Sequence, residues 1–581
     1  MFSRKKQILL LTLSLISTVL LAQEEEQDTI KTDVINVIKP YKPTISDAFK
    51  VKEAPTLDDE ETLTKKKIKY NIFSFPVAST FTPAKGKAAS VDKTEKARLF
   101  DNYATLGVGT YTTILGEIYL NHELGRGESM SAYLGHHSSG GGIEDVLLDD
   151  DFLDSKLNLS YSKRGRDLTW TIGGGFQLQS YNWYGVAQPR FVQTDVYGLD
   201  VGHTYTNGYV SGDIDFEDGY IKSGSVLFRR FGDNLGSGEN RFKAKTTVDV
   251  PVKGELVSTT VNIDYLGGAF DRSYFATEEL KYGNFQIGIS PTYQLKQDNL
   301  TVDVGFTATY LNDTEASKNK FFIYPKISAT YRLVDEVLIA FGGVKGGLIQ
   351  KSYYGFAQDN PFVSPTLFIT PTDQQYNAEL GLKGKLSNTM SYSVHGGYQS
   401  ERAKPLYVNN TINSGEVETT NYSYGNSFDI VYDNVSTLSV GGELNVDVNR
   451  NFTLGIKGDY FVYNTKTEEE AWNLPDIKAS VFLDYQITEQ WFAGANLFFT
   501  GERKDVFRDS TIITIPGDSS NSIVTLDSYF DVNANVGYHI NDRFSVFIKG
   551  NNLFGEEYTK WQNTPVQGIQ FLAGATYKFD F

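Results

Sequence analysis

YFDVNANVGYHI, residues 529–540, alternates between two kinds of side chain at every step. Its apolar face holds Phe530, Val532, Ala534, Val536, Tyr538 and Ile540, and its polar face holds Asp531, Asn533, Asn535, Gly537 and His539. A period of two predicts a β-strand with one apolar and one polar face. The length also matches the roughly 9–11 residues with which a tilted strand crosses a bilayer.

The same alternation recurs from about Asn102 onward, for example in 256–265, in 437–448 and in the last strand, which ends at Phe581. Short turns such as RGRD at 164–167 alternate with long polar loops, and this one-sided arrangement is typical of outer-membrane barrels. The predicted long loops are 139–153, 267–281, 311–319, 347–373, 401–435, 465–473, 501–524 and 554–566.

These patterns predict an all-β fold, a large transmembrane antiparallel β-barrel over residues 99–581. Lipid requires that every backbone N–H and C=O is paired and that no strand edge remains. The alternation itself gives about 23 strands. Because closed barrels of this kind have an even number, we expect about 22, with the error between Tyr181 and Asn240. The alternative is a soluble sandwich array or propeller, which would not need long loops at one end only.

The N-terminal part of the chain has a different composition. Residues 1–22, MFSRKKQILLLTLSLISTVLLA, combine a basic start, an apolar run and a small residue at Ala22, which predicts a secretory signal peptide cleaved near Ala22. An N-terminal membrane anchor is the alternative. Residues 23–98 hold one glycine and five prolines and keep no strand or helix period, so we expect an extended periplasmic or luminal segment.

Composition excludes several classes of function. The net charge of −17 disfavours nucleic acid as a partner, and the absence of cysteine excludes disulfides and thiolate chemistry. The adjacent pair His136–His137 would point to opposite faces of a strand, so it is a poor metal site. The acidic run Asp149, Asp150, Asp151 and Asp154 lacks a calcium-loop spacing and is expected to be a solvated loop. We therefore predict no enzyme, no catalytic residue, no cofactor and no metal.

The C-terminal stretch FSVFIKGNNLFGEEYTKWQNTPVQGIQFLAGATYKFDF, residues 544–581, resembles the end of TonB-dependent receptors. The resemblance rests on Asn551, Asn552, Leu553, Phe554, Tyr558 and Phe581. It implies that the last strand pairs with the first, that Asn551 and Asn552 end strand pairing near the outer rim, and that the barrel-assembly machinery reads the terminal aromatic residue.

The N-terminus departs from that family, whose barrels contain a large glycine-rich plug. Residues 23–98 are too short for a standard plug. The stretch formed by Asp33, Val34, Ile35, Asn36, Val37 and Ile38 resembles a TonB box, a short extended element that pairs with TonB by strand addition. The alternative is a spacer whose apolar residues pack in the lumen or on a partner.

A barrel of this width leaves an aqueous channel unless something fills it. The candidates are residues 23–98, the loops 347–373, 401–435 and 501–524 folded inward, or a partner protein. If residues 23–98 fill the lumen, their deletion makes cells permeable to large antibiotics. The aromatic loop segments 180–191 and 351–362 suit glycan or partner contacts, but aromatic girdles at the two membrane interfaces are the favoured interpretation.

The sequence therefore leads to two functions in the outer membrane of a Gram-negative bacterium. The first is receptor-like solute uptake, with outer-membrane lipid, the assembly machinery and TonB as partners. The second is a non-transporting scaffold subunit of an assembly, secretion or surface-lipoprotein complex. The C-terminal resemblance and the TonB-box-like stretch favour uptake, whereas the missing plug favours a scaffold. A simple diffusion channel is disfavoured by the size of the pore.

Overall fold

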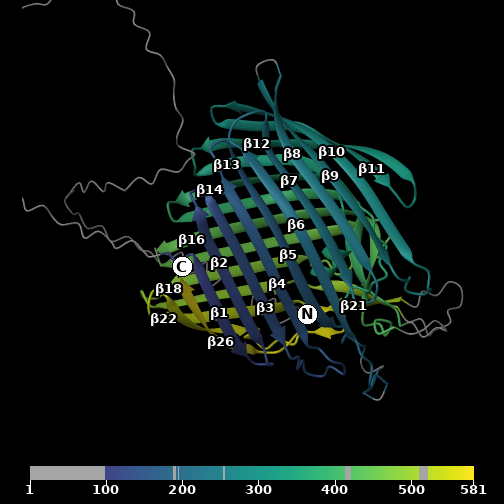
Figure 1. Cartoon of the computed structure of the whole chain (residues 1–581). Helices are drawn as coiled ribbons and strands as arrows, with labels where there is room; N and C mark the ends of the chain where they lie inside the picture. Colours follow the sequence, from purple (N-terminus) through teal and green to yellow (C-terminus); the bar gives the residue numbers. More distant parts are fainter. Residues whose placement is uncertain are drawn as a thin grey trace, which may run out of the picture. The chain divides into compact units, whose positions relative to one another are not determined.

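The computed structural model describes residues 99–581, except 188–190, 194, 253–254, 413–419, 450 and 509–520. The predicted signal peptide, the TonB-box-like stretch 33–38 and the rest of the segment 23–98 lie outside these residues. Over the described residues, 22 strands form one continuous antiparallel sheet that closes on itself (Figure 1). This confirms the predicted barrel and its even strand number.

The strands follow one another around the barrel in chain order. The first eleven are β1 (Asn102–Gly109), β2 (Ile114–Gly125), β3 (Glu128–Ser139), β4 (Phe152–Arg164), β5 (Leu168–Asn182), β6 (Gly202–Phe216), β7 (Ile221–Asp233), β8 (Gly238–Val252), β9 (Glu255–Phe270), β10 (Leu280–Gln297) and β11 (Leu300–Asp313). The remaining eleven are β12 (Lys318–Val334), β13 (Leu338–Ile349), β14 (Thr372–Ser387), β15 (Met390–Asn409), β16 (Phe428–Asn449), β17 (Phe452–Thr465), β18 (Ile477–Gln486), β19 (Trp491–Thr500), β22 (Tyr529–His539), β23 (Phe544–Asn551) and β26 (Gln570–Phe579).

Four short strands lie outside the barrel wall and form two small hairpins in the loops. They are β20 (Arg503–Arg508), β21 (Asn521–Leu526), β24 (Thr559–Trp561) and β25 (Thr564–Pro565). The α-helix α2 (Tyr353–Asp359) lies in the loop between β13 and β14. Over the described part of the chain, no helix is both long and apolar enough to span a membrane.

The seam between β1 and β26 closes the barrel. The two strands pair from Asn102 opposite Phe579 to Gly109 opposite Leu572, so the last strand pairs with the first, as the resemblance implies. The hydroxyls of Thr105 and Thr576 lie 2.9 Å apart across this seam. Closure leaves no strand edge in the wall, which is what a lipid environment requires.

The predicted alternation matches the two faces of the wall. In β16, Leu438 and Val440 are exposed large apolar residues, and Val536 on β22 is exposed in the same way. Exposed apolar side chains at every second position of a strand are typical of a lipid-facing barrel surface. The polar residues of the same strands face the lumen.

The two ends of the barrel differ in their connections. The turns after β2, β4, β6 and the corresponding later strands are short, whereas long loops such as 140–151, 350–371 and 410–427 emerge at the other end. The predicted long loop at 311–319 is wrong, because β11 and β12 extend until only residues 314–317 connect them. Strand pairing from Asp313 opposite Lys318 explains the difference.

The loop 183–201 between β5 and β6 lies within the segment, Tyr181 to Asn240, where we expected the error in the strand count. Its apolar residues Trp183, Val186, Val196 and Val201 are buried against one another and against other loops rather than facing lipid.

Candidate functional site: the loop-closed mouth

The loop 350–371 carries the helix α2 across the loop end of the barrel. Ser352 starts the helix, and its side-chain oxygen accepts a 3.0 Å hydrogen bond from the Gly355 amide. Serine is a favoured N-cap because it satisfies an amide that the helix leaves unpaired. Asn360 and Pro361 end the helix, since a residue before proline disfavours the helical backbone.

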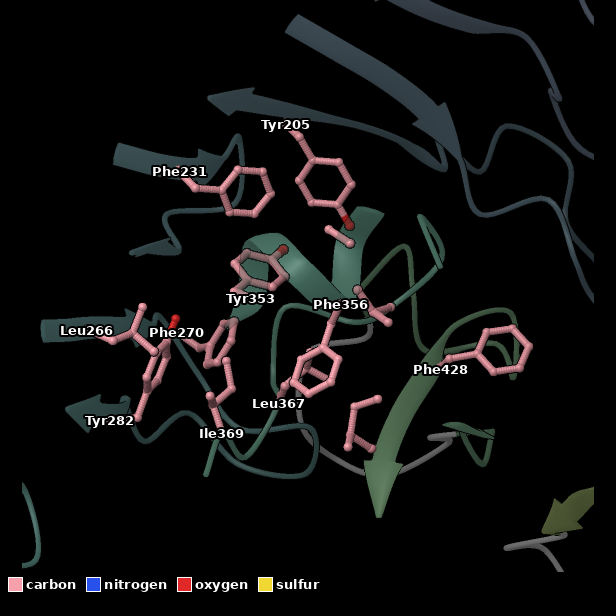
Figure 2. Close-up of a cluster of buried hydrophobic side chains, with 13 residues drawn as sticks. Tyr205, Phe231, Leu266, Phe270, Tyr282, Tyr353, Phe356, Leu367, Ile369 and Phe428 are labelled. Carbon is pink, nitrogen blue, oxygen red and sulfur yellow. The ribbon is translucent and has the colours of Figure 1, made fainter. Parts of the chain in front are cut away.

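An apolar cluster joins this loop to the barrel wall (Figure 2). Its loop members are Tyr353, Phe356, Ala357, Val363, Leu367 and Ile369, and its wall members are Tyr205, Phe231, Leu266, Phe270, Tyr282, Phe428 and Ile430. The wall members come from β6, β7, β9, β10 and β16. Since β6 and β16 lie on opposite sides of the ring of strands, the loop crosses the mouth rather than lining one side of it.

Two carboxylates, the buried Glu239 and the partly buried Asp233, hold the start of α2. The Tyr353 amide donates to Glu239 Oε2 at 2.7 Å, and the Tyr282 hydroxyl donates to the same oxygen at 2.9 Å. The Tyr353 hydroxyl donates to Asp233 Oδ2 at 2.8 Å. The first turn of a helix carries partial positive charge, so a carboxylate there is favourable. Burial raises the pKa of Tyr353 well above its ordinary value, so this hydroxyl remains a donor.

A cation–π contact adds to this attachment. The guanidinium carbon of Arg229 lies 4.0 Å from the centre of the Tyr354 ring. Partly desolvated contacts of this kind contribute about 1–2 kcal/mol. We call the contacts of Arg229, Asp233 and Glu239 with Tyr353 and Tyr354 the latch.

The far end of the helix is held by β6. Both His203 Nε2, at 3.0 Å, and the Tyr205 hydroxyl, at 3.1 Å, donate to the carbonyl oxygen of Pro361. The His203 ring stacks on Trp183 with ring centres 3.9 Å apart. These contacts fix the chain direction where α2 gives way to extended backbone.

The segment after α2 pairs with β16 like a short strand. The Phe428 amide donates to the Phe362 carbonyl at 3.0 Å, and the Ser364 amide donates to the Phe428 carbonyl at 2.9 Å. The indole N–H of Trp183 also donates to the Phe362 carbonyl, at 3.1 Å. Backbone pairing of this kind fixes the loop against the opposite wall.

Neighbouring loops interlock with 350–371 and with one another. Asn426 donates to the Trp183 carbonyl at 2.7 Å, and the Tyr184 hydroxyl donates to the Pro565 carbonyl at 2.9 Å. Burial raises the pKa of Tyr184 above its ordinary value, so its hydroxyl stays protonated. The loops after β5, β13, β15 and β23 therefore form one connected layer.

The hairpin β20–β21 clamps the last loop to this layer. Arg503 is buried, and its guanidinium donates to the carbonyls of Thr559, at 2.8 Å, and Lys560. The amide of Asn409 on β15 donates to Asp505 Oδ1 at 3.2 Å. The described parts of the predicted loops 347–373, 401–435 and 501–524 are thus joined in one layer, and which segment fills the lumen stays a prediction.

Asn552 of the C-terminal signature braces the last loop. Its backbone has a left-handed φ of +47°, and its side-chain amide donates to the carbonyls of Glu556, at 3.0 Å, and Gln567, at 3.1 Å. The Asn552 amide N–H also donates to Asn533 Oδ1 at 3.2 Å. This residue ends β23 and closes the following loop, consistent with the predicted position at the rim.

The other signature residues have separate surroundings. The Tyr558 ring stacks on Tyr529 with centres 3.8 Å apart, and the Leu553 amide donates to the Val532 carbonyl. Asn551 makes a long contact of 3.4 Å with Gln570, and Phe554 and Phe581 are largely exposed. The structure does not bring these six residues together, and recognition by the assembly machinery stays a prediction.

Residues of the acidic run stabilise the loop 140–151 through hydrogen bonds. The Asp150 carboxylate accepts from the amides of Gly142, at 3.0 Å, and Ile143, at 2.8 Å, and Asp151 accepts from Asn182. His136 contacts the hydroxyls of Ser155 and Ser138. Within the described residues, no group of His, Asp and Glu side chains is arranged to hold a metal ion.

A polar cavity of about 570 Å³ lies against the wall of β6–β11. Its lining includes Ser211, Asp213, Lys243, Lys245, Asn262, Asp264, Ser290, Thr307 and Thr309. Gln286, which also lines it, donates to the Gln350 side chain at 2.6 Å, and this contact joins the cavity wall to the start of the loop 350–371. Arg241 and Asp264 form a two-pronged ion pair at 2.9 and 2.6 Å.

The loop aromatics were interpreted as girdles at the membrane interfaces. For Trp183 and Tyr353 this interpretation is wrong. Trp183 and Tyr353 are each 1% exposed and lie inside the loop layer. Sequence reasoning also missed the latch residues Arg229, Asp233 and Glu239. These charged residues lie near the loop ends of their strands, and that position was the only signal in the sequence. Which loop they contact could not be predicted from it.

A sequence model described as TonB dependent receptor-like, beta-barrel matches residues 96–553. No curated protein matches the chain. Among solved structures, the pyoverdine outer membrane receptor FpvA from Pseudomonas aeruginosa PAO1 has 11% identity and a TM-score of 0.60, covering 84% of this chain and 80% of that one. The ferric-catecholate import receptor Fiu from E. coli K12 has 10% identity and a TM-score of 0.59, covering 83% and 82%.

The siderophore receptor PiuA from Acinetobacter baumannii is similar to the same degree, with 10% identity, a TM-score of 0.59 and coverage of 83% and 82%. These TM-scores show a common fold. The match to the barrel model extends over most of the chain and includes the strand that carries Asn551 and the rim residue Asn552. Together with the closed ring of 22 strands, it places this chain in the TonB-dependent receptor-like β-barrel family.

Proposed function

We propose that this protein takes up a solute across the outer membrane of a Gram-negative bacterium, after removal of the signal peptide near Ala22. The loop 350–371 acts as the outer gate, and the described conformation is the closed one. Solute enters when the latch releases and reaches the polar lumen beneath. We assign the protein no catalytic role and no cofactor.

The observation that carries this proposal is the way in which the loop is attached. Besides the apolar cluster, its contacts with the wall include hydrogen bonds at the first turn of α2, at Gln358, at Pro361 and at Phe362. Each is a hydrogen bond from a separate strand, and the polar cavity adjoins the start of the loop at Gln350. A closed mouth with a polar lumen suits gated entry better than free diffusion. The family and the receptors similar in fold support the same proposal.

TonB is the proposed energy source, and residues 33–38 are its proposed contact. Energised uptake needs a partner that transmits force from the inner membrane, and an extended β-prone segment is suited to strand addition. Residues 23–98 are proposed to be a short periplasmic or luminal segment in place of a standard plug.

A scaffold subunit is the second candidate. The observation that favours it is the extent of the apolar cluster that joins the loop 350–371 to β6, β7, β9, β10 and β16. Burial of so many large side chains stabilises a permanently closed mouth. A barrel closed in this way would hold surface lipoproteins or assembly factors on its rim rather than pass solute.

Gentle detergent purification of the tagged full chain from its native membrane tests the two candidates. Uptake predicts that TonB is retained by the intact chain and lost when residues 33–38 are replaced with a glycine-serine segment of equal length. Lipoproteins or assembly factors that co-purify in a fixed ratio with both the intact chain and the replaced chain would contradict uptake and support the scaffold.

A further inference from the structure

On the lipid-facing wall across β14–β17, one row of paired residues is apolar and the next row toward the loop end is largely polar. Tyr398 pairs with Leu438, and Leu438 pairs with Val462, so these three exposed residues form one row across β15, β16 and β17. The next row toward the loop end is Tyr376, Ser400, Ser436 and Asn464. Such a step from apolar to hydroxyl and amide groups marks the edge of the hydrocarbon layer.

Two tyrosines support this position of the membrane boundary. The rings of Tyr376 and Tyr398 are stacked with centres 6.0 Å apart, and both are exposed. Tyrosines with an apolar ring and a polar hydroxyl gather at membrane–water interfaces. The surface beyond them therefore lies at the level of lipid headgroups.

A groove of about 380 Å³ begins at this boundary. Its lining includes Ser400, Arg402, Asn434, Ser436, Asn464 and Lys466. Arg402 and Lys466 are both exposed. Arg402 lies two residues beyond Ser400 toward the loop end, and Lys466 lies two residues beyond Asn464. Two cations beside hydroxyls and amides provide the donors that a phosphate group binds.

The acidic groups nearby are occupied by other partners or buried. Asp373 lies 4.0 Å from Arg402, but its side chain is 15% exposed against 62% for Arg402, and it accepts from the Tyr324 hydroxyl at 2.9 Å. Glu401 is buried and paired with Lys404. The groove therefore presents mainly positive charge to its surroundings.

Asp433 is also satisfied within the protein. Its Oδ2 accepts from the backbone amides of Lys466, at 2.8 Å, Thr467, at 2.8 Å, and Glu468, at 2.9 Å. This carboxylate therefore fixes the backbone of Lys466 at the edge of the groove, and its own side chain is buried. The backbone that carries the Lys466 side chain is therefore held by the fold at the edge of the groove.

We propose that this groove binds the phosphate of an outer-leaflet glycolipid of the lipid A type, with Arg402 and Lys466 as the phosphate ligands. Ser400, Ser436, Asn434 and Asn464 would contact the sugar, and the acyl chains would lie against the apolar row below. The inference rests on the proposed placement of the barrel in the outer membrane. It requires no particular transported solute.

Binding of lipid A to the full chain in detergent micelles tests the proposal, with native mass spectrometry as the readout. The double variant Arg402→Gln/Lys466→Gln should bind lipid A about tenfold more weakly, the usual effect of losing charge-assisted hydrogen bonds. The matched control, Arg166→Gln/Lys385→Gln, removes two exposed cations at the turn end and should bind like the wild type. Equal binding by the wild type and the double variant overturns the proposal.

Two further probes use the wild-type protein alone, so they decide the matter even if the double variant does not fold. Dephosphorylated lipid A should bind about tenfold more weakly than lipid A. Inorganic phosphate should not displace lipid A at equal concentration, and displacement would identify a free-anion site and overturn the lipid assignment. Because no arm measures uptake, a protein that binds lipid A but transports nothing keeps this inference and loses the proposed function.

Discussion

The amide of Tyr353 donates a 2.7 Å hydrogen bond to the carboxylate of Glu239, and this contact joins the first turn of α2 to strand β8. Glu239 is 1% exposed, and the same oxygen also accepts from Tyr282. A buried carboxylate that serves two donors is costly to remove, because both donors are then left without a partner. The attachment of the loop 350–371 thus depends strongly on one side chain.

We expect Glu239→Ala to loosen the loop 350–371 without unfolding the barrel. Losing a charged acceptor costs about 1.5–3 kcal/mol, which corresponds to at least a tenfold faster opening of α2. Hydrogen exchange of the α2 amides measures this opening. The control is Glu443→Ala on β16, an exposed glutamate far from the loop, which should leave exchange unchanged. Equal protection of α2 in both variants would show that Glu239 does not hold the gate.

Tyr353 and Tyr354 are neighbours with different roles, and the same substitution separates them. Tyr353→Phe removes the hydroxyl that donates to Asp233 at 2.8 Å and should destabilise the loop by about 1–2 kcal/mol. Tyr354→Phe keeps the ring that faces Arg229 and should be nearly neutral. Hydrogen exchange of α2 distinguishes them, and a larger effect from Tyr354→Phe would contradict the proposed latch.

Alternation was enough to predict the barrel, because each wall strand has one face in lipid and one in water. Leu438 and Val536 are exposed on the apolar face that this rule predicts for their strands. The seam was also predictable, since a closed sheet leaves the last strand no other partner than the first. Local pattern determines the wall because every residue there meets the same two environments.

The attachment of the loop 350–371 could not be predicted in the same way. Glu239 and Tyr353 are far apart in sequence, and neither position carries a local signal for the other. Trp183 belongs to a loop segment whose aromatic residues were interpreted as a membrane girdle, but it is buried against other loops together with Val186. Contacts between loops depend on the diameter of the barrel and on which loops meet across it. The alternation of apolar and polar residues gives no information on either.

Gly175 is expected to be essential to the lumen wall. A Cβ at this position would lie 2.6 Å from the Tyr209 ring and 2.8 Å from the Leu157 carbonyl, so the backbone or the ring must move. Gly175→Ala should lower the temperature at which the folded barrel is lost on a semi-native gel. Gly458→Ala is the matched control, because a Cβ there meets no atom within 4 Å. A lower melting temperature for Gly458→Ala than for Gly175→Ala would contradict this account.

Asn552 combines a left-handed backbone with two side-chain hydrogen bonds, and two variants separate the contributions. Asn552→Gly keeps the backbone conformation but loses the contacts with Glu556 and Gln567, so we expect a loss of about 1–2 kcal/mol. Asn552→Ala adds backbone strain and should cost about 1 kcal/mol more. Thermal unfolding on a semi-native gel gives the order. Asn551→Ala, which removes only a 3.4 Å contact, should change little.

The gate itself can be tested by conductance, since the chain has no cysteine to interfere with introduced thiols. Gln358 donates to Gln179 at 2.7 Å, so Gln358→Cys/Gln179→Cys with a cleavable dithiol linker ties α2 to β5. In planar bilayers the tied barrel should show fewer openings, and a reductant should restore them. Replacing residues 353–369 with a short glycine-serine linker should raise the conductance. If all three forms conduct equally, the pathway is sealed by something other than the loop 350–371.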